Sequence, residues 1–98
     1  GYGAGKTGLL GMTRGLAVDL GSRNIRVNVV AAGMVETRMT EQVFAGSEWL
    51  APSLARTPLG RLGVPDDIAG PVLFLSSPAA SWITGQVLMA DGGYTIMG

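Results

Sequence analysis

The sequence contains no cysteine and no histidine. Without cysteine the chain forms no disulfide and offers no thiolate to a metal ion. Without histidine it has no imidazole for acid–base catalysis and lacks the commonest metal ligand. We therefore expect no metal site, and the missing cysteine favours a reducing compartment such as the cytoplasm.

Charged residues are also scarce. They make up 14% of the chain, against about 25% in ordinary globular proteins. The 7 basic residues balance the 7 acidic residues, and no basic run or stripe appears, so the sequence predicts no nucleic-acid binding. No apolar run approaches the roughly 18 residues of a membrane span, and no signal peptide is visible. We expect no contact with a membrane, and we expect the natural start upstream because the first residue is not Met.

Hydrophobic residues, in contrast, make up 47% of only 98 residues. A chain this short buries a smaller share of its surface than a full-size domain does. The sequence therefore has more apolar surface than a small domain can easily hide. It predicts a piece of a larger fold, or a chain that buries surface against a partner.

The apolar pattern alternates between two periods along the chain. Residues 3–20 have the helical period, and residues 25–31 form a short β-branched run that is typical of a strand buried on both faces. Residues 38–57 predict one or two short helices in a lid-like excursion. A helix over 64–77 and a second short strand over 86–90 follow. This alternation predicts an α/β fold with a parallel sheet.

The first predicted helix carries three glycines one turn apart. Gly8, Gly11 and Gly15 form either a flat face for the close approach of another backbone or simply a weak helix that packing rescues. Gly21 is a natural stop at the helix C-terminus. The stripe at helical spacing consists of Leu9, Thr13, Leu16, Ala17 and Leu20, widened by Leu10 and Met12.

The opening stretch GYGAGKT allows three interpretations. Gly5-Lys6-Thr7 is the end of a phosphate-binding P-loop pattern, but that pattern needs an earlier glycine and a preceding strand, and the chain shows neither. Residues 3–8 spell GxGxxG, which also needs a preceding strand and a later acid that is missing. In the third interpretation Tyr2 and Lys6 share one helical face, where a cation favours the phenolate and lowers its pKa.

The downstream segments decide between these interpretations, because together the motifs resemble the C-terminal part of a short-chain dehydrogenase/reductase of the 3-oxoacyl-(acyl carrier protein) reductase kind. Nearly the whole chain takes part in this resemblance. The motifs are Tyr2-Gly3-Ala4-Gly5-Lys6, similar to the family's Tyr-x-x-x-Lys; the helix Gly8 to Leu20; the strand and turn Ile25 to Gly33, followed by Thr37; the segment Pro58 to Ala69; and Ile83-Thr84-Gly85-Gln86 with Asp91-Gly92-Gly93.

The resemblance implies the C-terminal portion of a Rossmann-type, doubly wound parallel sheet, in the order helix, strand, helical lid, helix, strand. Residues 1–98 would form part of one domain, with the cofactor-binding N-terminal half absent. The implied activity is the NAD- or NADP-dependent interconversion of an alcohol and a ketone, on a small-molecule substrate, by a homodimer or homotetramer. The 98 residues alone are expected to be inactive.

The resemblance also implies roles for particular residues. Tyr2 would be the catalytic acid/base, and Lys6 would lower the Tyr2 pKa and bind the nicotinamide ribose. The remaining residues are a cofactor-binding group, Gly33, Met34, Val35 and Thr37, and a substrate-binding group, Met39, Phe44 and Trp49. For the substrate group, packing within the lid is an equally good interpretation.

Two positions depart from the family pattern. Ala32 replaces the usual proline before Gly33, which makes that turn less rigid, and Gly5 softens the helix between Tyr2 and Lys6. A second hypothesis therefore stays open, in which the chain is a non-catalytic oligomerisation or interaction module built on its glycine-faced helix and last strand.

Overall fold

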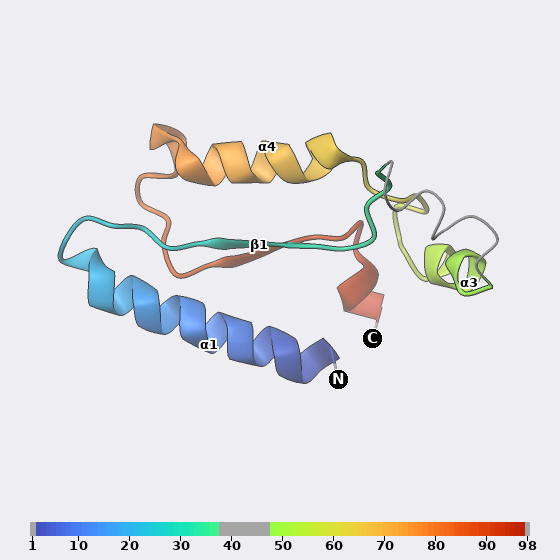
Figure 1. Ribbon diagram of the computed structural model, residues 1–98, viewed down its shortest axis with the longest axis horizontal. Coiled ribbons are helices and arrows are strands. Elements are labelled where there is room, and N and C mark those ends of the chain that lie inside the picture. The colour runs from blue at the N-terminus through green and yellow to red at the C-terminus, as the bar shows by residue number, and fades with distance from the viewer. Residues whose placement is uncertain (1, 38–47, 98) are drawn as a thin grey trace. The chain divides into compact units, whose positions relative to one another are not determined.

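The computed structural model describes residues 2–37 and 48–97. Helices and strands alternate along these residues (Figure 1). The elements are α1 Tyr2–Gly21, β1 Val29–Ala32, α3 Leu50–Ala55, α4 Pro65–Ser76 and β2 Val87–Ala90, with short 3₁₀ helices η1 Pro78–Ala80 and η2 Tyr94–Met97. The alternation predicted from the apolar periods is therefore confirmed.

Strands β1 and β2 pair in a two-stranded sheet. The Val29 amide donates to the Gln86 carbonyl at 2.9 Å, and the Gly33 amide donates to the Ala90 carbonyl at 3.0 Å. Both partners advance by four residues together, so the strands run parallel. Parallel strands need a crossover connection, and α4 lies in it. The α/β class with parallel strands is therefore confirmed.

The chain divides into two compact units. The first comprises Gly1–Val30 and Val72–Leu88, and the second comprises Ala31–Pro71 and Met89–Gly98. Within the first unit, α1 and the end of α4 lie on opposite faces of the strand segments (Figure 1). Helices on both faces of a sheet are the arrangement of a doubly wound fold.

A narrow strip of α1 is buried in the first unit. Thr13 and Ala17 are buried, and the Thr13 hydroxyl donates to the Leu9 carbonyl at 2.7 Å, which satisfies it inside the apolar contact. Gly85, which has a positive φ of 73°, lies against Ala17. A Cβ on Gly85 would stand 3.4 Å from the Ala17 Cβ, so this glycine allows the close approach.

The rest of the apolar stripe on α1 is only partly covered. Leu9, Leu10 and Leu20 are half-buried, whereas Met12 is 59% exposed and Leu16 is 43% exposed. A Cβ added at Gly8, Gly11 or Gly15 would meet nothing within 4 Å in the described part of the chain. The full burial of α1 is therefore confined to Thr13 and Ala17. No helix in the described ranges combines the length and apolar character needed to cross a membrane.

Helix α1 ends differently from the sequence-based prediction. Gly21 belongs to the helix, and the left-handed residue is Asn24, with φ 60°. The amides of Arg23 and Ile25 donate to the Leu20 carbonyl and so close the last turn. Asn tolerates the left-handed region better than most residues, which explains why it can take the position usually given to glycine.

Strand β1 begins at Val29, four residues later than predicted. Just before the strand, the side-chain amide of Asn28 bonds across to the segment before β2. Its Nδ2 donates to the Ile83 carbonyl at 3.0 Å, and its Oδ1 accepts from the Gln86 amide at 3.1 Å. These side-chain bonds add to the backbone bond from the Gly85 amide to the Val27 carbonyl, at 2.7 Å.

Candidate active site

The first two candidate residues lie at the start of α1. Tyr2 is the first helical residue, and Lys6 follows one turn later with an exposed side chain. Positions four apart share a helical face. Residues 3–8 are helical throughout, whereas both phosphate-binding patterns require a loop whose amides point at the ligand. The P-loop and GxGxxG interpretations are therefore wrong.

The second group of candidates follows β1 at its carboxyl end. Here the chain is held by backbone hydrogen bonds to a segment far along the sequence. The Gly63 amide donates to the Met34 carbonyl at 2.9 Å, and the Glu36 amide donates to the Gly63 carbonyl at 2.8 Å. Val35 and Gly63 thereby form a parallel bridge. The loop has a defined backbone path without belonging to the sheet.

Gly33, the first residue of that loop, meets the turn after β2. A Cβ on Gly33 would fall 2.7 Å from the Asp91 Cβ and 2.8 Å from its Cα, so only glycine fits. Asp91 accepts from the Gly93 amide at 2.9 Å and from the Thr95 amide and hydroxyl at 3.0 and 2.7 Å. Burial opposes ionisation of Asp91, but these hydrogen bonds outweigh it and lower its pKa.

The same final turn contacts the segment that follows α3. Gly92 and Gly93 have φ values of 65° and 91°. A Cβ on Gly92 would stand 2.9 Å from Thr57 Cγ2, and one on Gly93 would stand 2.9 Å from Pro58 Cγ. The Leu59 amide donates to the Gly92 carbonyl at 3.0 Å. Asp91-Gly92-Gly93 is therefore the point where the loop after β1 and the segment after α3 meet.

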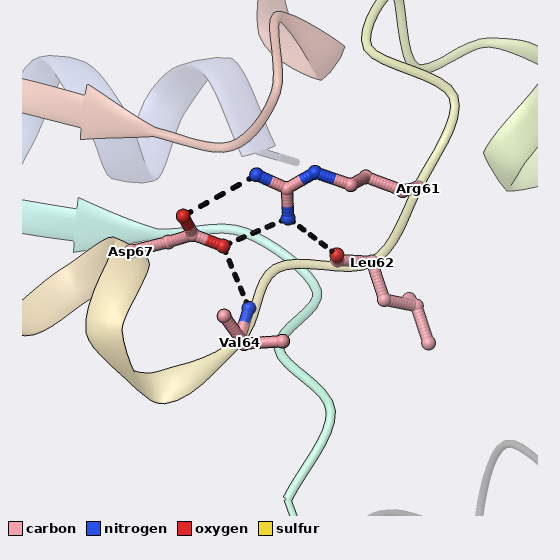
Figure 2. A network of polar contacts seen from close by, with 4 residues as sticks. All are labelled: Arg61, Leu62, Val64 and Asp67. Atoms are coloured by element: carbon pink, nitrogen blue, oxygen red, sulfur yellow. Dashed lines mark hydrogen bonds and ion pairs between the residues drawn. The ribbon is translucent and has the colours of Figure 1, made fainter.

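An ion pair stands at the start of α4 (Figure 2). Arg61 Nη1 lies 2.8 Å from Asp67 Oδ2, and Nη2 lies 3.3 Å from Oδ1. Arg61 Nη1 also donates to the Leu62 carbonyl, and Asp67 Oδ2 accepts from the Val64 amide at 2.8 Å. These bonds, first that from Arg61 and then that from Val64, lower the Asp67 pKa to about 2.

The sequence predicts the start of a helix at the acids in positions 66 and 67, but it does not reveal the pair with Arg61. The sequence does contain one signal for the role of Asp67 at the start of the helix. Asp67 is the third residue of α4, where an acidic side chain can accept from the backbone amide just before the helix. The Arg61 partner six residues earlier has no such local rule.

The remaining predicted site residues are distributed as follows. Trp49 lies directly before α3 and is 46% exposed, and Thr37 is half-buried. Met39 and Phe44 lie outside the described residues. Tyr2 and Lys6 belong to the first compact unit, whereas residues 33–37 belong to the second. Acidic side chains in the described ranges form no group of three or more that could hold a metal ion.

Parallel strands with helices on both faces are the arrangement of a Rossmann-type α/β fold, of which the chain forms part. The enoyl-(acyl carrier protein) reductase family matches residues 1–95. The chain belongs to this family of short-chain dehydrogenases/reductases.

Individual relatives agree with that assignment. The chain is 48% identical to 3-oxoacyl-[acyl-carrier-protein] reductase FabG of Thermotoga maritima, over 97% of this chain and 38% of FabG. A solved 4-hydroxyisoleucine dehydrogenase complexed with NADH matches with a TM-score of 0.82 and 35% identity, over 97% of this chain and 39% of that one. A blue fluorescent protein from a metagenomic library, in complex with NADPH, matches with a TM-score of 0.80 and 45% identity, over 95% and 36%. The chain thus spans somewhat more than a third of the length of these relatives.

Proposed function

We propose that the chain supplies the proton-transfer side of an NAD- or NADP-dependent oxidoreductase that interconverts an alcohol and a ketone. The observation that carries this proposal is the Tyr-x-x-x-Lys pair at the start of α1, in a chain that matches an oxidoreductase family over residues 1–95. Because the matched relatives are longer, the activity is proposed for the full-length protein that contains these residues.

Tyr2 acts as the acid/base. In reduction its hydroxyl donates a proton to the substrate oxygen, and in oxidation its phenolate takes the proton back. A phenol ionises near pH 10, so it needs a neighbouring cation to work near neutrality. Lys6 is that cation, one helical turn away, and it also donates to the nicotinamide ribose. The bound cofactor supplies or accepts the hydride.

The loop of residues 33–37 holds the nicotinamide end of the cofactor. Its position after β1 supports this, because ligands of open α/β sheets bind beyond the carboxyl ends of the strands. The Gly33 amide already donates to Ala90, so Gly33 contributes close approach of its backbone rather than that donor. The backbone of Met34 and Val35 and the Thr37 hydroxyl then contact the carboxamide and the phosphates. Backbone groups and a hydroxyl suit a nicotinamide cofactor, because its carboxamide donates and accepts hydrogen bonds and its phosphates accept them.

Residues 38–57 form the substrate loop, with Met39, Phe44 and Trp49 as apolar contacts to a small carbonyl or alcohol substrate. The exposed Trp49 side chain, which precedes α3, supports this role because a large exposed aromatic is a common binding contact. The 98 residues alone would lack turnover, since the rest of the cofactor site would come from residues outside them. A cytoplasmic location is part of the same proposal.

Self-association is the second part of the proposal. The face of α1 that contains Gly8, Gly11, Met12 and Gly15 is open in the described structure. Glycines on one helical face let another backbone approach closely, and Met12 adds apolar area to such a contact. We propose that a second copy of the chain covers this face in a homodimer or homotetramer. The same face would serve a non-catalytic interaction module.

Replacing Tyr2 in the full-length protein tests the catalytic proposal. Tyr2→Phe should lower turnover of a 3-oxoacyl thioester by about 10²- to 10⁴-fold, the usual contribution of a general acid. Titration of NADPH or NADH fluorescence should show that the cofactor still binds. Tyr94→Phe is the matched control, because it removes the other tyrosine hydroxyl of the sequence, from η2. Turnover above a few per cent in Tyr2→Phe would contradict the acid/base role.

A further inference from the structure

The loop after β1 owes its backbone path to a short segment before α4. Gly63 donates to the Met34 carbonyl at 2.9 Å and accepts from the Glu36 amide at 2.8 Å. These are the two backbone hydrogen bonds on either side of Val35, which itself bridges to Gly63. Where Gly63 lies therefore decides where residues 34–36 lie.

Gly63 is in turn fixed by the side chains on either side of it. Arg61 and Asp67 form a two-point ion pair across the segment, and the Val64 amide donates to the same Asp67 carboxylate (Figure 2). Arg61 also donates to the Leu62 carbonyl at 3.0 Å. The residues before and after Gly63 are thus tied to one carboxylate at the start of α4.

Gly63 lies beside both the loop and the carboxylate. A Cβ added there would make ordinary van der Waals contacts, at 3.5 Å from the Met34 carbonyl oxygen, 3.5 Å from Val35 Cγ2 and 3.7 Å from Asp67 Oδ2. The link from the ion pair to the loop therefore runs through the backbone of residues 62–64, whose carbonyl and amide groups bond to Arg61, Asp67 and the loop.

We infer that Arg61 and Asp67 are positioning residues that hold the backbone of residues 34–36 in place for the cofactor. This inference rests on the proposed function, since it takes residues 33–37 as the cofactor loop. Neither side chain needs to touch the cofactor. Their loss should weaken cofactor binding and leave the proton transfer at Tyr2 intact.

The experiment compares Asp67→Asn with Asp66→Asn in the full-length protein. Both variants remove one carboxylate from the first turn of α4, so both lose a similar favourable interaction with the helix dipole. Of the two carboxylates, it is Asp67 that contacts Arg61 and the Val64 amide. Hydrogen exchange of peptides covering residues 33–37 and 61–64 is measured without cofactor. Dissociation of NADH and NADPH is then measured by fluorescence, and kcat is measured at saturating cofactor.

Asp67→Asn should speed exchange in both peptides and raise the cofactor Kd by about three- to tenfold, with kcat changed less than twofold. Asp66→Asn should match the wild type in all three measurements. Asp67→Glu, which keeps the charge, should restore part of the cofactor affinity. A general loss of folding would instead lower kcat and weaken cofactor binding together, and it would speed exchange over the whole chain.

Each contrary result has a separate meaning. Unchanged exchange in Asp67→Asn would overturn the positioning role. Faster exchange with an unchanged cofactor Kd would overturn the link between this loop and the cofactor. If the wild type bound neither NADH nor NADPH, the proposed function itself would fail, while the exchange comparison would still decide whether Asp67 fixes the loop.

Discussion

Gly33 and Asp91 lie in contact at the carboxyl ends of the two strands. A Cβ added to Gly33 would come within 2.7 Å of the Asp91 Cβ, and no real pair of such atoms comes that close without movement. Asp91 cannot easily move, because three hydrogen bonds from Gly93 and Thr95 hold its carboxylate. The contact therefore constrains the loop after β1 from its first residue.

Gly33→Ala should lower the free energy of unfolding by about 1–3 kcal/mol, the usual cost of an extra carbon in a tight contact. Gly5→Ala is the control. Gly5 lies in α1, and a Cβ on it would meet nothing within 4 Å in the described chain, so this change should raise the free energy of unfolding by up to about 1 kcal/mol through helix propensity. Urea unfolding of both variants checks the prediction, and effects of the same sign would contradict it.

Lys6→Ala should weaken cofactor binding and shift the rise of the oxidation rate to higher pH. Under the proposed mechanism, removing the cation of Lys6 makes the phenolate of Tyr2 form less readily. Lys6 is the single lysine of the sequence, so Lys6→Arg tests whether the charge alone suffices. Arg14→Ala, which removes an exposed cation two turns further along α1, is the control and should leave the pH profile of kcat/KM unchanged.

The Arg61–Asp67 pair should make stability depend on pH in an acidic window. The folded-state pKa of Asp67 is about 2, below its ordinary value of 3.8, so the ionised form favours the fold. Its contribution is complete above about pH 4 and is lost as the pH falls through about 2. The urea midpoints of the wild type and Asp67→Asn should therefore differ at about pH 5 and converge near about pH 2.

Salt provides an internal check on that measurement. Both side chains are partly exposed, and at about 1 M salt charges are screened beyond about 3 Å. The difference between wild type and Asp67→Asn near neutral pH should therefore shrink when the salt concentration is raised. In the pH experiment, a difference between the two urea midpoints that stayed the same in strong acid would mean that the substitution acts through something other than the charge of Asp67.

Gly15→Leu should reduce self-association without harming the helix. A side chain at Gly15 meets nothing within 4 Å in the described chain, and leucine is a better helix former than glycine. The added bulk would, however, keep a second backbone away. Sedimentation of the full-length protein should show a lower mass, with helical circular dichroism retained. Gly21→Leu, on another side of α1, should sediment like the wild type.

Much of the fold follows from local sequence rules. The helical period of residues 3–20 and the two short apolar runs near 25–31 and 86–90 predict α1, β1 and β2 within a few residues. Pro65 and the acids after it predict the start of α4, and Pro71 is accommodated inside that helix. These features depend on neighbours in the sequence, which is why a single sequence suffices to predict them.

The features that the sequence does not predict depend on contacts between distant segments. Nothing near Asp67 in the sequence shows that Gly63 pairs with the loop after β1. The contact of Gly33 with Asp91 likewise exists only because two strands end side by side. Met12 belongs to the apolar stripe of α1 and is nevertheless exposed, because helical periodicity reports which side of a helix is apolar and not whether a neighbour covers it.

Asn28 has one further consequence. Its side-chain amide donates to the Ile83 carbonyl and accepts from the Gln86 amide, so Ile83 and Gln86 must lie opposite Asn28 at the same time. Sliding one strand past the other by a single residue would break both bonds and turn every side chain of that strand to the other face. Asn28 thus sets the register of the sheet together with the Gly85 amide, which donates to the Val27 carbonyl at 2.7 Å. An aspartate at position 28 would keep the acceptor toward Gln86 and lose the donor toward Ile83.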